Sequence, residues 1–234
     1  AAEKRAIFSC FSDANIGIVN GDQEALTSIS YAYPVLKFGL KTSNQIQARK
    51  ISIKNNVITF VAKIYKKKYS IVLQGSHEGS VLNALAAISI AHMIEVPTEI
   101  AIEGVQKPLA VQGRFEFCNT KNHGIIVNDS YNANPESVKA GLLAFNAYES
   151  DCSRVVVLGD MLELGIDEAF WHRQIGRFLR KISGIKHLIL VGHMIDWTKK
   201  TAPIGLNVES FETWEQALPV IKKITNSKTI TFVK

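Results

Sequence analysis

The chain has few cysteines and no long apolar run. Its three cysteines, at positions 10, 118 and 152, are odd in number and far apart. This spacing argues against a disulfide framework or a zinc site, and it fits free thiols in a reducing compartment. No stretch approaches the roughly 18 to 20 apolar residues of a membrane helix, and the first residues, AAEKRAIFSCF, lack the apolar region of a signal peptide. We therefore expect a cytoplasmic protein without membrane insertion, and we expect a monomer.

The sequence also lacks the pattern of a nucleic-acid-binding surface. Its net charge is +6, but such a surface needs basic residues interleaved with aromatic ones on one face. The densest basic cluster, Lys66 to Lys68, lies between two strand-like runs, which predicts an exposed hairpin turn. We expect no nucleic-acid partner, and part of the positive charge suits highly charged anionic ligands.

The pattern of the chain changes near Lys107-Pro108. Before this point we expect a short strand at 16–20, an antiparallel meander between 35 and 73, and helices at 80–94 and 98–105. After it, strands and helices alternate, as in a parallel α/β domain. The sequence therefore predicts an α/β protein with two domains, residues 1–108 and 109–234.

Polar residues follow three apolar runs in the second domain. The runs are HGIIV (123–127), RVVVL (154–158) and HLILV (187–191), and they lead into Asp129, Asp160 and Gly192-His193. If the three strands are parallel, these residues lie at one edge of the sheet, where open α/β sheets bind ligands. The alternative is that they are ordinary turn and cap residues. We favour that alternative for Gly192 and His193.

Residues 127–135 (VNDSYNANP) carry the most information. Asn134 is suited to cap the helix that follows, and Pro135 to occupy its first turn, where a missing N–H costs nothing. In the first domain, Asn20 and Asp22 are interpreted as structural turn residues.

Six short motifs, in their order and spacing, resemble the Mur ligase family of peptidoglycan synthesis. They are AEKRAIF (2–8), VNGD (19–22), LNALAA (82–87), QGRFE (112–116), DSYNANP (129–135) and GDMLELG (159–165). Within the family they are most similar to the enzymes that add D-alanyl-D-alanine (D-Ala-D-Ala) to UDP-N-acetylmuramoyl-tripeptide. The resemblance implies the C-terminal part of a central ATPase domain, containing the antiparallel meander, followed by a Rossmann-like α/β C-terminal domain.

Two elements of the family are missing from these residues. No GxxGK[TS] P-loop occurs in the sequence, and the glutamate and histidine that hold magnesium in the family's central domain have no match. The resemblance implies that the chain begins inside the central domain and stops at Lys234, where the family continues into a KGSR segment and a final helix. Because phosphate and metal contacts supply most of the catalysis in phosphoryl transfer, we expect no ATP hydrolysis by this chain alone.

The resemblance assigns five residues to ATP and Mg²⁺. Lys4 matches a carbamylated lysine that becomes an oxygen ligand for magnesium; the alternative is a solvated helix lysine. Asn83 matches an adenine-reading asparagine, and His77 lies near it in a segment about two residues longer than the family's. Arg114 matches an arginine that contacts ATP phosphate, the alternative being a salt bridge with Glu116. Asp129 matches an ATP-facing aspartate.

The resemblance assigns the remaining candidates to the acceptor side, facing the incoming dipeptide. They are Ser130, Tyr131, Asn132, Asn134, Asp160, Met161, Glu163 and His172. Asn134 also has the capping role described above, and a helix-surface histidine is the alternative interpretation of His172.

The resemblance implies a ligation in stages. ATP phosphorylates the carboxylate of UDP-N-acetylmuramoyl-tripeptide, and the amine of D-Ala-D-Ala then displaces phosphate from the acyl phosphate. The protein contributes positioning and charge neutralisation. Two alternatives remain open. One is a folylpolyglutamate synthetase-like ligase, for which DGAHNP is expected where this chain has NDSYNANP. The other is a degenerate or isolated fragment that binds a nucleotide or partner without turnover.

Overall fold

The computed structural model describes residues 6–54, 56–75, 77–108, 111–148 and 150–234. The chain divides into two compact units, unit 1 (Ala1–Leu109) and unit 2 (Ala110–Lys234), and each is described by itself. Lys4 lies outside the described residues. Within the described ranges, no helix has the length and apolar character needed to cross a membrane.

Unit 1 contains a five-stranded sheet in the order β1-β2-β3-β4-β5. The strands are β1 Gly17–Asn20, β2 Val35–Gly39, β3 Ile46–Lys54, β4 Val57–Ile64 and β5 Lys67–Gln74. β3, β4 and β5 form the antiparallel meander that the sequence predicts. The prediction was wrong for β2, which pairs in parallel with both β1 and β3. The connection from β1 to β2 carries the short helix α2 (Glu24–Thr27), and it is long enough to return the chain to the same end of the sheet.

Two helices pack on this sheet: α3 (Glu78–Met93) lies against β1, β2 and β3, and α4 (Thr98–Gln106) lies against β5. α3 buries Val81, Leu85 and Ile88 at helical spacing. It begins at Glu78, two residues before the predicted start at Ser80. A carboxylate in the first turn interacts favourably with the positive end of the helix dipole, and Glu78 provides one.

The three lysines at 66–68 are exposed at the β4–β5 hairpin, as predicted. Asp22 is a turn residue, as predicted. Asn20 is the last residue of β1 rather than a turn residue, and its side-chain oxygen accepts from the N–H of Asp22 (2.9 Å). Asp22 accepts hydrogen bonds from the N–H groups of Leu40 (2.6 Å) and Lys41 (2.9 Å) and from the amide of Asn44 (2.9 Å). Burial raises the pKa of Asp22, but these three donors and the charge of Lys41 outweigh it, so its pKa lies below the usual value.

Unit 2 contains a six-stranded sheet in the order β10-β9-β8-β11-β7-β6. The strands are β6 Glu116–Thr120, β7 Gly124–Asn128, β8 Ser153–Gly159, β9 Ile185–Val191, β10 Asn207–Phe211 and β11 Thr229–Val233. All neighbours are parallel except β6, which pairs with β7 in antiparallel fashion at one edge. The last strand of the sequence, β11, lies in the interior of the sheet between β7 and β8.

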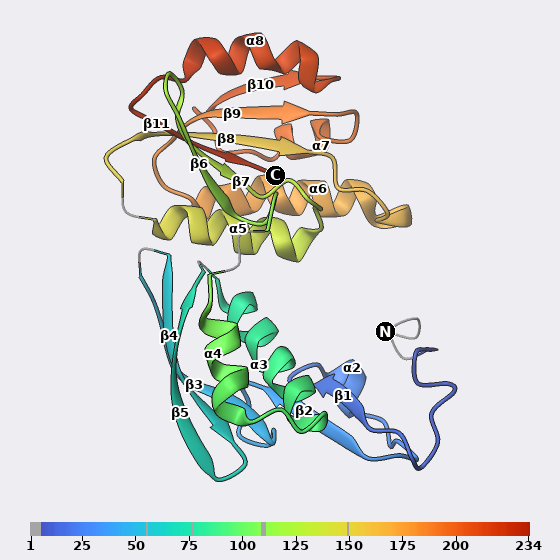
Figure 1. The fold of residues 1–234 in the computed structure, drawn as a ribbon. Helices are drawn as coiled ribbons and strands as arrows, with labels where there is room; N and C mark the ends of the chain where they lie inside the picture. Colours follow the sequence, from blue (N-terminus) through green and yellow to red (C-terminus); the bar gives the residue numbers. More distant parts are fainter. Residues whose placement is uncertain (1–5, 55, 76, 109–110, 149) are drawn as a thin grey trace. The chain divides into compact units, whose positions relative to one another are not determined.

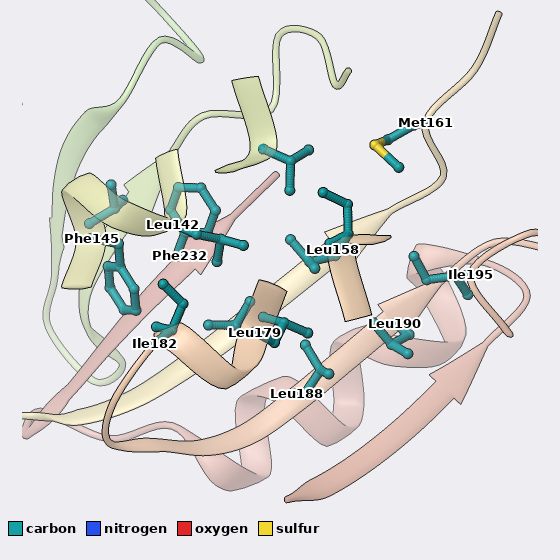
Figure 2. Close-up of a cluster of buried hydrophobic side chains, with 14 of the residues drawn as sticks. Leu142, Phe145, Leu158, Met161, Leu179, Ile182, Leu188, Leu190, Ile195 and Phe232 are labelled. Atoms are coloured by element: carbon teal, nitrogen blue, oxygen red, sulfur yellow. The ribbon is translucent and has the colours of Figure 1, made fainter. Parts of the chain in front are cut away.

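Helices cover both faces of this sheet (Figure 1). The helices and 3₁₀ turns are α5 Pro135–Ala147, η1 Gly165–Asp167, α6 Glu168–Phe178, η2 Leu179–Lys181, α7 Asp196–Lys199 and α8 Trp214–Ile224. α5 and α6 enclose the larger apolar core, in which Leu142, Phe145, Leu158 and Phe232 pack together (Figure 2). α8 covers the other face through Ala217. Both faces are therefore buried, as the continuous β-branched run of β8 predicts.

Asn134 caps α5, as predicted. Its side chain accepts from the N–H of Ser137 (2.8 Å), and the Ser137 hydroxyl accepts from the N–H of Asn134 (3.1 Å), which forms a capping box. Pro135 occupies the first turn of the helix. The loop after β7 is thus joined rigidly to the helix behind it.

Candidate functional site

The carboxyl ends of four parallel strands meet at one edge of the sheet in unit 2. Asp129 follows β7, Asp160 follows β8, Gly192-His193 follow β9 and Lys234 follows β11. The predicted alignment of Asp129, Asp160 and His193 is therefore confirmed. The structure adds Lys234, which the sequence analysis did not assign to the site.

The carboxylate of Asp129 joins two other segments of the chain. Oδ1 accepts from the N–H of Phe115 (3.1 Å), and Oδ2 accepts from the ammonium of Lys234 (2.6 Å). Lys234 also donates to the Asp129 carbonyl oxygen (3.2 Å). The side chains of Lys234 and Asp129 are 3% and 13% exposed. The only sequence signal for Lys234 is its position: it directly follows an apolar run, which becomes the strand beside β7.

Arg114 stacks on Tyr131. The guanidinium carbon lies 4.0 Å from the centre of the Tyr131 ring, and the N–H of Tyr131 donates to the carbonyl of Gly113 (3.1 Å). No ion pair joins Arg114 to Glu116 in the part of the chain that the structure describes; Glu116 accepts from the N–H of Gly113 instead (3.1 Å). The aromatic face thus holds the exposed guanidinium while its N–H edges stay open to an anion.

The loop after Asp129 is exposed. Tyr131 is 67% exposed, and Ser130 and Asn132 are also at the surface. The Ser130 hydroxyl donates to Asn128 Oδ1 (2.7 Å). The side-chain oxygen of Asn134 already accepts the N–H of Ser137 in the helix cap. The structure therefore leaves Tyr131 and Asn132 more available to a ligand than Asn134.

Asp160 is held by the loop after β9. Its carboxylate accepts from the N–H of His193 (2.8 Å) and of Met194 (3.1 Å). It lies so close to Gly192 that a Cβ there would collide with it, and Gly192 has a φ of 127°. Gly192 and His193 are turn residues, as we favoured, and they also position Asp160.

Two of the predicted acceptor residues are buried. Met161 is 2% exposed and packs in the core of unit 2 (Figure 2). His172 is 0% exposed. The interpretation of His172 as a helix-surface residue was wrong, and neither side chain is open to a dipeptide in this structure. Met161 packs into the apolar core beneath the loop after β8. His172 lies on the face of α6 that is buried against the rest of unit 2.

Glu163 is exposed, with a φ of 61°. Its neighbour Leu162 is 70% exposed. In the loop after β8, Asp160 is therefore hydrogen-bonded and Met161 is buried, whereas Leu162 and Glu163 are exposed.

Two of the predicted residues lie in unit 1. Asn83 is exposed in the second turn of α3, and His77 is the N-cap residue of the same helix. Among the residues that the structure describes, no three His, Cys, Asp or Glu side chains form a metal-binding group. The predicted magnesium ligand, Lys4, lies outside this part of the chain.

A hollow of about 360 Å³ lies on the α8 side of the unit 2 sheet. Its lining is almost entirely apolar and includes Ile126, Val157 and Trp214. It contains none of the predicted site residues.

Two family models together match most of the chain. The Mur ligase middle domain matches residues 1–91, and the Mur ligase glutamate ligase domain matches residues 113–234. A mixed sheet in unit 1 and a largely parallel sheet in unit 2 agree with this assignment. The chain belongs to the Mur ligase family.

The curated relatives include UDP-N-acetylmuramoyl-tripeptide–D-alanyl-D-alanine ligases. The enzyme of Bacillus subtilis is 30% identical over 75% of this chain and 38% of its own length. The enzyme of Buchnera aphidicola is 28% identical over 100% of this chain and 50% of its own length. The matched part of the chain therefore spans half or less of the length of each of these two relatives.

Solved structures share the fold. MurF from Acinetobacter baumannii has a TM-score of 0.80 at 22% identity and covers 98% of this chain and 50% of its own. MurF ligase from Thermotoga maritima, solved in complex with ADP, has a TM-score of 0.78 at 18% identity and covers 99% of this chain and 52% of its own. At these identities the likeness shows the fold, and the site residues have to be argued from their own geometry.

Proposed function

We propose that this chain forms the nucleotide-facing and acceptor-facing parts of an ATP-dependent ligase that joins D-Ala-D-Ala to UDP-N-acetylmuramoyl-tripeptide. The names of the curated relatives support this activity. The main structural support for this proposal is Arg114, an exposed arginine whose guanidinium lies 4.0 Å over the Tyr131 ring. It lies at the edge of the unit 2 sheet where the parallel strands end, which is where α/β sheets bind ligands.

Arg114 suits the binding of ATP phosphate. Its guanidinium is permanently charged and offers planar, bidentate N–H donors to phosphate oxygens. Stacking on Tyr131 restricts its orientation before any ligand arrives, so less side-chain entropy is lost on binding. In the reaction, this charge offsets the negative charge that shifts between phosphate oxygens.

Asp129 has a supporting and a binding role in this proposal. Its hydrogen bond to the Phe115 N–H fixes the loop that carries Arg114. Each carboxylate oxygen has a second lone pair, with which Asp129 accepts a hydrogen bond from a ribose hydroxyl of ATP. Lys234 orients this carboxylate through the 2.6 Å contact of its ammonium with Oδ2.

In unit 1, Asn83 is assigned to the adenine of ATP. An amide donates and accepts at once, as an adenine edge requires, and Asn83 is exposed on α3. His77, at the N-cap of α3, lies in the same segment. The proposal for Mg²⁺ rests on Lys4, whose carbamylated form supplies the oxygen ligand that this ion prefers.

The acceptor side consists of the exposed loops after β7 and β8. Ser130, Tyr131 and Asn132 line the first, and Glu163 projects from the second. These residues orient the amine of D-Ala-D-Ala toward the activated carboxylate of the muramoyl tripeptide. A reaction between two bound substrates gains mainly from such positioning.

The test is phosphate release from ATP in the presence of Mg²⁺, UDP-N-acetylmuramoyl-tripeptide and D-Ala-D-Ala. The 234-residue chain is compared with a version extended through the adjoining coding sequence on both sides. Because no P-loop occurs in the 234 residues, we expect turnover only from the extended version. Turnover by the short chain would contradict the assigned ATP site, and silence from both would contradict the ligase assignment.

Arg114→Lys is the decisive variant in the extended version. We expect kcat/KM to fall about 10²- to 10³-fold, as for the loss of one charge-stabilising donor. Arg173→Lys is the matched control, since the Arg173 guanidinium also stacks on an aromatic ring, that of Trp197, at 5.0 Å. Equal losses in the two variants would assign Arg114 a structural role only. Replacement of D-Ala-D-Ala by glutamate, with a folate as second substrate, tests the alternative ligase chemistry.

A further inference from the structure

His172 is a fully buried histidine whose two ring nitrogens both contact backbone groups. Nε2 lies 3.1 Å from the backbone nitrogen of Met161, and Nδ1 lies 2.9 Å from the carbonyl oxygen of Glu168. The side chain is 0% exposed. A buried polar side chain is retained at little cost only when its hydrogen bonds are satisfied, and both nitrogens of His172 are.

The polarity of these two partners fixes the state of the ring. A backbone N–H can only donate, so Nε2 must carry a lone pair. A carbonyl oxygen can only accept, so Nδ1 must carry the proton. The hydrogen-bond network therefore assigns the neutral Nδ1–H tautomer to His172. Oδ1 of Asp160 lies 4.0 Å from Nε2.

The contacts of His172 join three segments. Its ring, on α6, holds the backbone of Met161 directly after β8. Its own carbonyl oxygen accepts from the hydroxyl of Thr198 on α7 (3.0 Å), which is also buried. Asp160, the residue before Met161, binds the N–H groups of His193 and Met194. The base of the loop 160–165 is thus fixed from two sides.

Beyond this base the loop turns outward. Met161 is 2% exposed, whereas Leu162 is 70% exposed. Glu163 and Gly165 adopt left-handed backbone conformations with φ of 61° and 60°. Such a tight turn transmits the orientation of its base, because few backbone conformations are open to a non-glycine residue with positive φ.

We propose that His172, as the neutral Nδ1–H tautomer, is the positioning residue for the loop 160–165, and that it orients Leu162 and Glu163 toward the acceptor dipeptide. The assignment of this loop to the dipeptide rests on the proposed function. The anchoring by His172 does not, because it follows from contacts within unit 2.

The tautomer is tested on the 234-residue chain itself. Two-dimensional ¹⁵N NMR of the histidine rings distinguishes a protonated from an unprotonated ring nitrogen. We expect His172 to show a protonated Nδ1 and an unprotonated Nε2. A protonated Nε2, in the neutral ring or in a doubly protonated one, would overturn the proposal. This measurement needs no variant and no activity.

Amide hydrogen exchange tests the anchoring. His172→Leu removes the acceptor for the Met161 N–H, and we expect exchange at Met161 to accelerate about tenfold or more. His172→Gln places an amide oxygen near the former Nε2 and should restore most of the protection. Unchanged protection at Met161 in the leucine variant would overturn the proposal. Should that variant fail to fold, the tautomer measurement still decides.

The functional part is tested in the extended, active protein. We expect His172→Leu to raise KM for D-Ala-D-Ala about tenfold, the effect of one lost hydrogen bond, and to leave KM for ATP within about twofold. His172→Gln should recover most of the loss. Equal changes in both KM values would indicate general destabilisation and overturn the assignment. If the unsubstituted extended protein shows no turnover, the proposed function fails, whereas the NMR result on His172 still stands.

Discussion

The ammonium of Lys234 lies 2.6 Å from Oδ2 of Asp129. The two residues are 105 positions apart in the sequence, and their pairing joins the end of β11 to the end of β7. Because both side chains are largely buried, water compensates poorly for the loss of either partner. The pair therefore fixes the geometry of the loop that carries Arg114 as well as the end of the sheet.

Lys234→Met should destabilise unit 2 by about 3 to 5 kcal/mol, because it leaves a buried carboxylate without its partner. Replacing both residues, with Asp129→Asn and Lys234→Met, should recover a large part of this loss. All three tryptophans, at 171, 197 and 214, lie in unit 2, so urea unfolding followed by tryptophan fluorescence reports this unit.

Lys228→Met is the control for that series, since Lys228 is exposed in the turn before β11. It should change the free energy of unfolding by less than about 0.5 kcal/mol. An equally small effect of Lys234→Met would mean that the buried pair does not form in solution.

Asp22→Asn should destabilise unit 1 by about 1 to 3 kcal/mol at neutral pH, because an amide N–H would then face the backbone donors of Leu40 and Lys41. The pKa of Asp22 is lowered in the folded state, so its stabilisation is complete above the unfolded pKa of about 3.9. It is lost as the pH falls below that value and through the folded pKa. The difference between the two proteins should therefore shrink in acid.

Circular dichroism measures this effect, because unit 1 contains no tryptophan. The Asp22 variant should shift a circular dichroism transition and leave the tryptophan fluorescence transition in place. A shift confined to the fluorescence transition would contradict the assignment of Asp22 to the stability of unit 1.

Cys118 should be alkylated far more slowly than Cys10 at neutral pH. Burial and the neighbouring carboxylate of Glu116 raise the pKa of the Cys118 thiol, and the thiolate is the reactive form. Cys10 is exposed. Peptide mapping by mass spectrometry after timed exposure to iodoacetamide gives both rates. Glu116→Gln should accelerate labelling of Cys118 and leave that of Cys10 unchanged. Comparable labelling rates at the two cysteines in the unsubstituted protein would contradict the burial of the Cys118 thiol.

Asn134→Ala should lower the stability of unit 2 by about 1 kcal/mol through loss of the α5 cap. Asn132→Ala, at an exposed position in the same loop, should have almost no effect on stability. Urea unfolding by tryptophan fluorescence measures both. In the extended ligase the order should reverse, with Asn132→Ala impairing use of the dipeptide more than Asn134→Ala. Loss of stability in the Asn132 variant would indicate that it, too, is structural.

Local patterns predicted much of this structure. The Asn134 cap, the Lys66–Lys68 hairpin and the common edge of Asp129 and Asp160 follow from short-range rules for caps, turns and parallel strands. The parallel pairing of β2 was not predicted, because alternation of apolar residues marks a strand without specifying the direction of its neighbours.

The site was less predictable than the fold, because burial and hydrogen-bond partners depend on contacts that are distant in the sequence. Met161 and Leu162 are adjacent apolar residues in one loop, yet one is buried and the other exposed. His172 is hydrogen-bonded to a residue eleven positions earlier, and Lys234 to one more than a hundred positions earlier. Burial and partners of this kind depend on tertiary packing, to which the spacing of residues along the chain gives no access.

The position of β11 has a consequence for synthesis on the ribosome. In unit 1 the strands lie in the sheet in the order in which they are made, so each can pair as it emerges. In unit 2 the interior strand β11, residues 229–233, is made after every other strand of its sheet. Until it arrives, the nascent β7 and β8 have open edges facing each other, a state that exposes apolar surface and unpaired backbone. Unit 2 therefore cannot complete its sheet until residues 229–233 have left the ribosome.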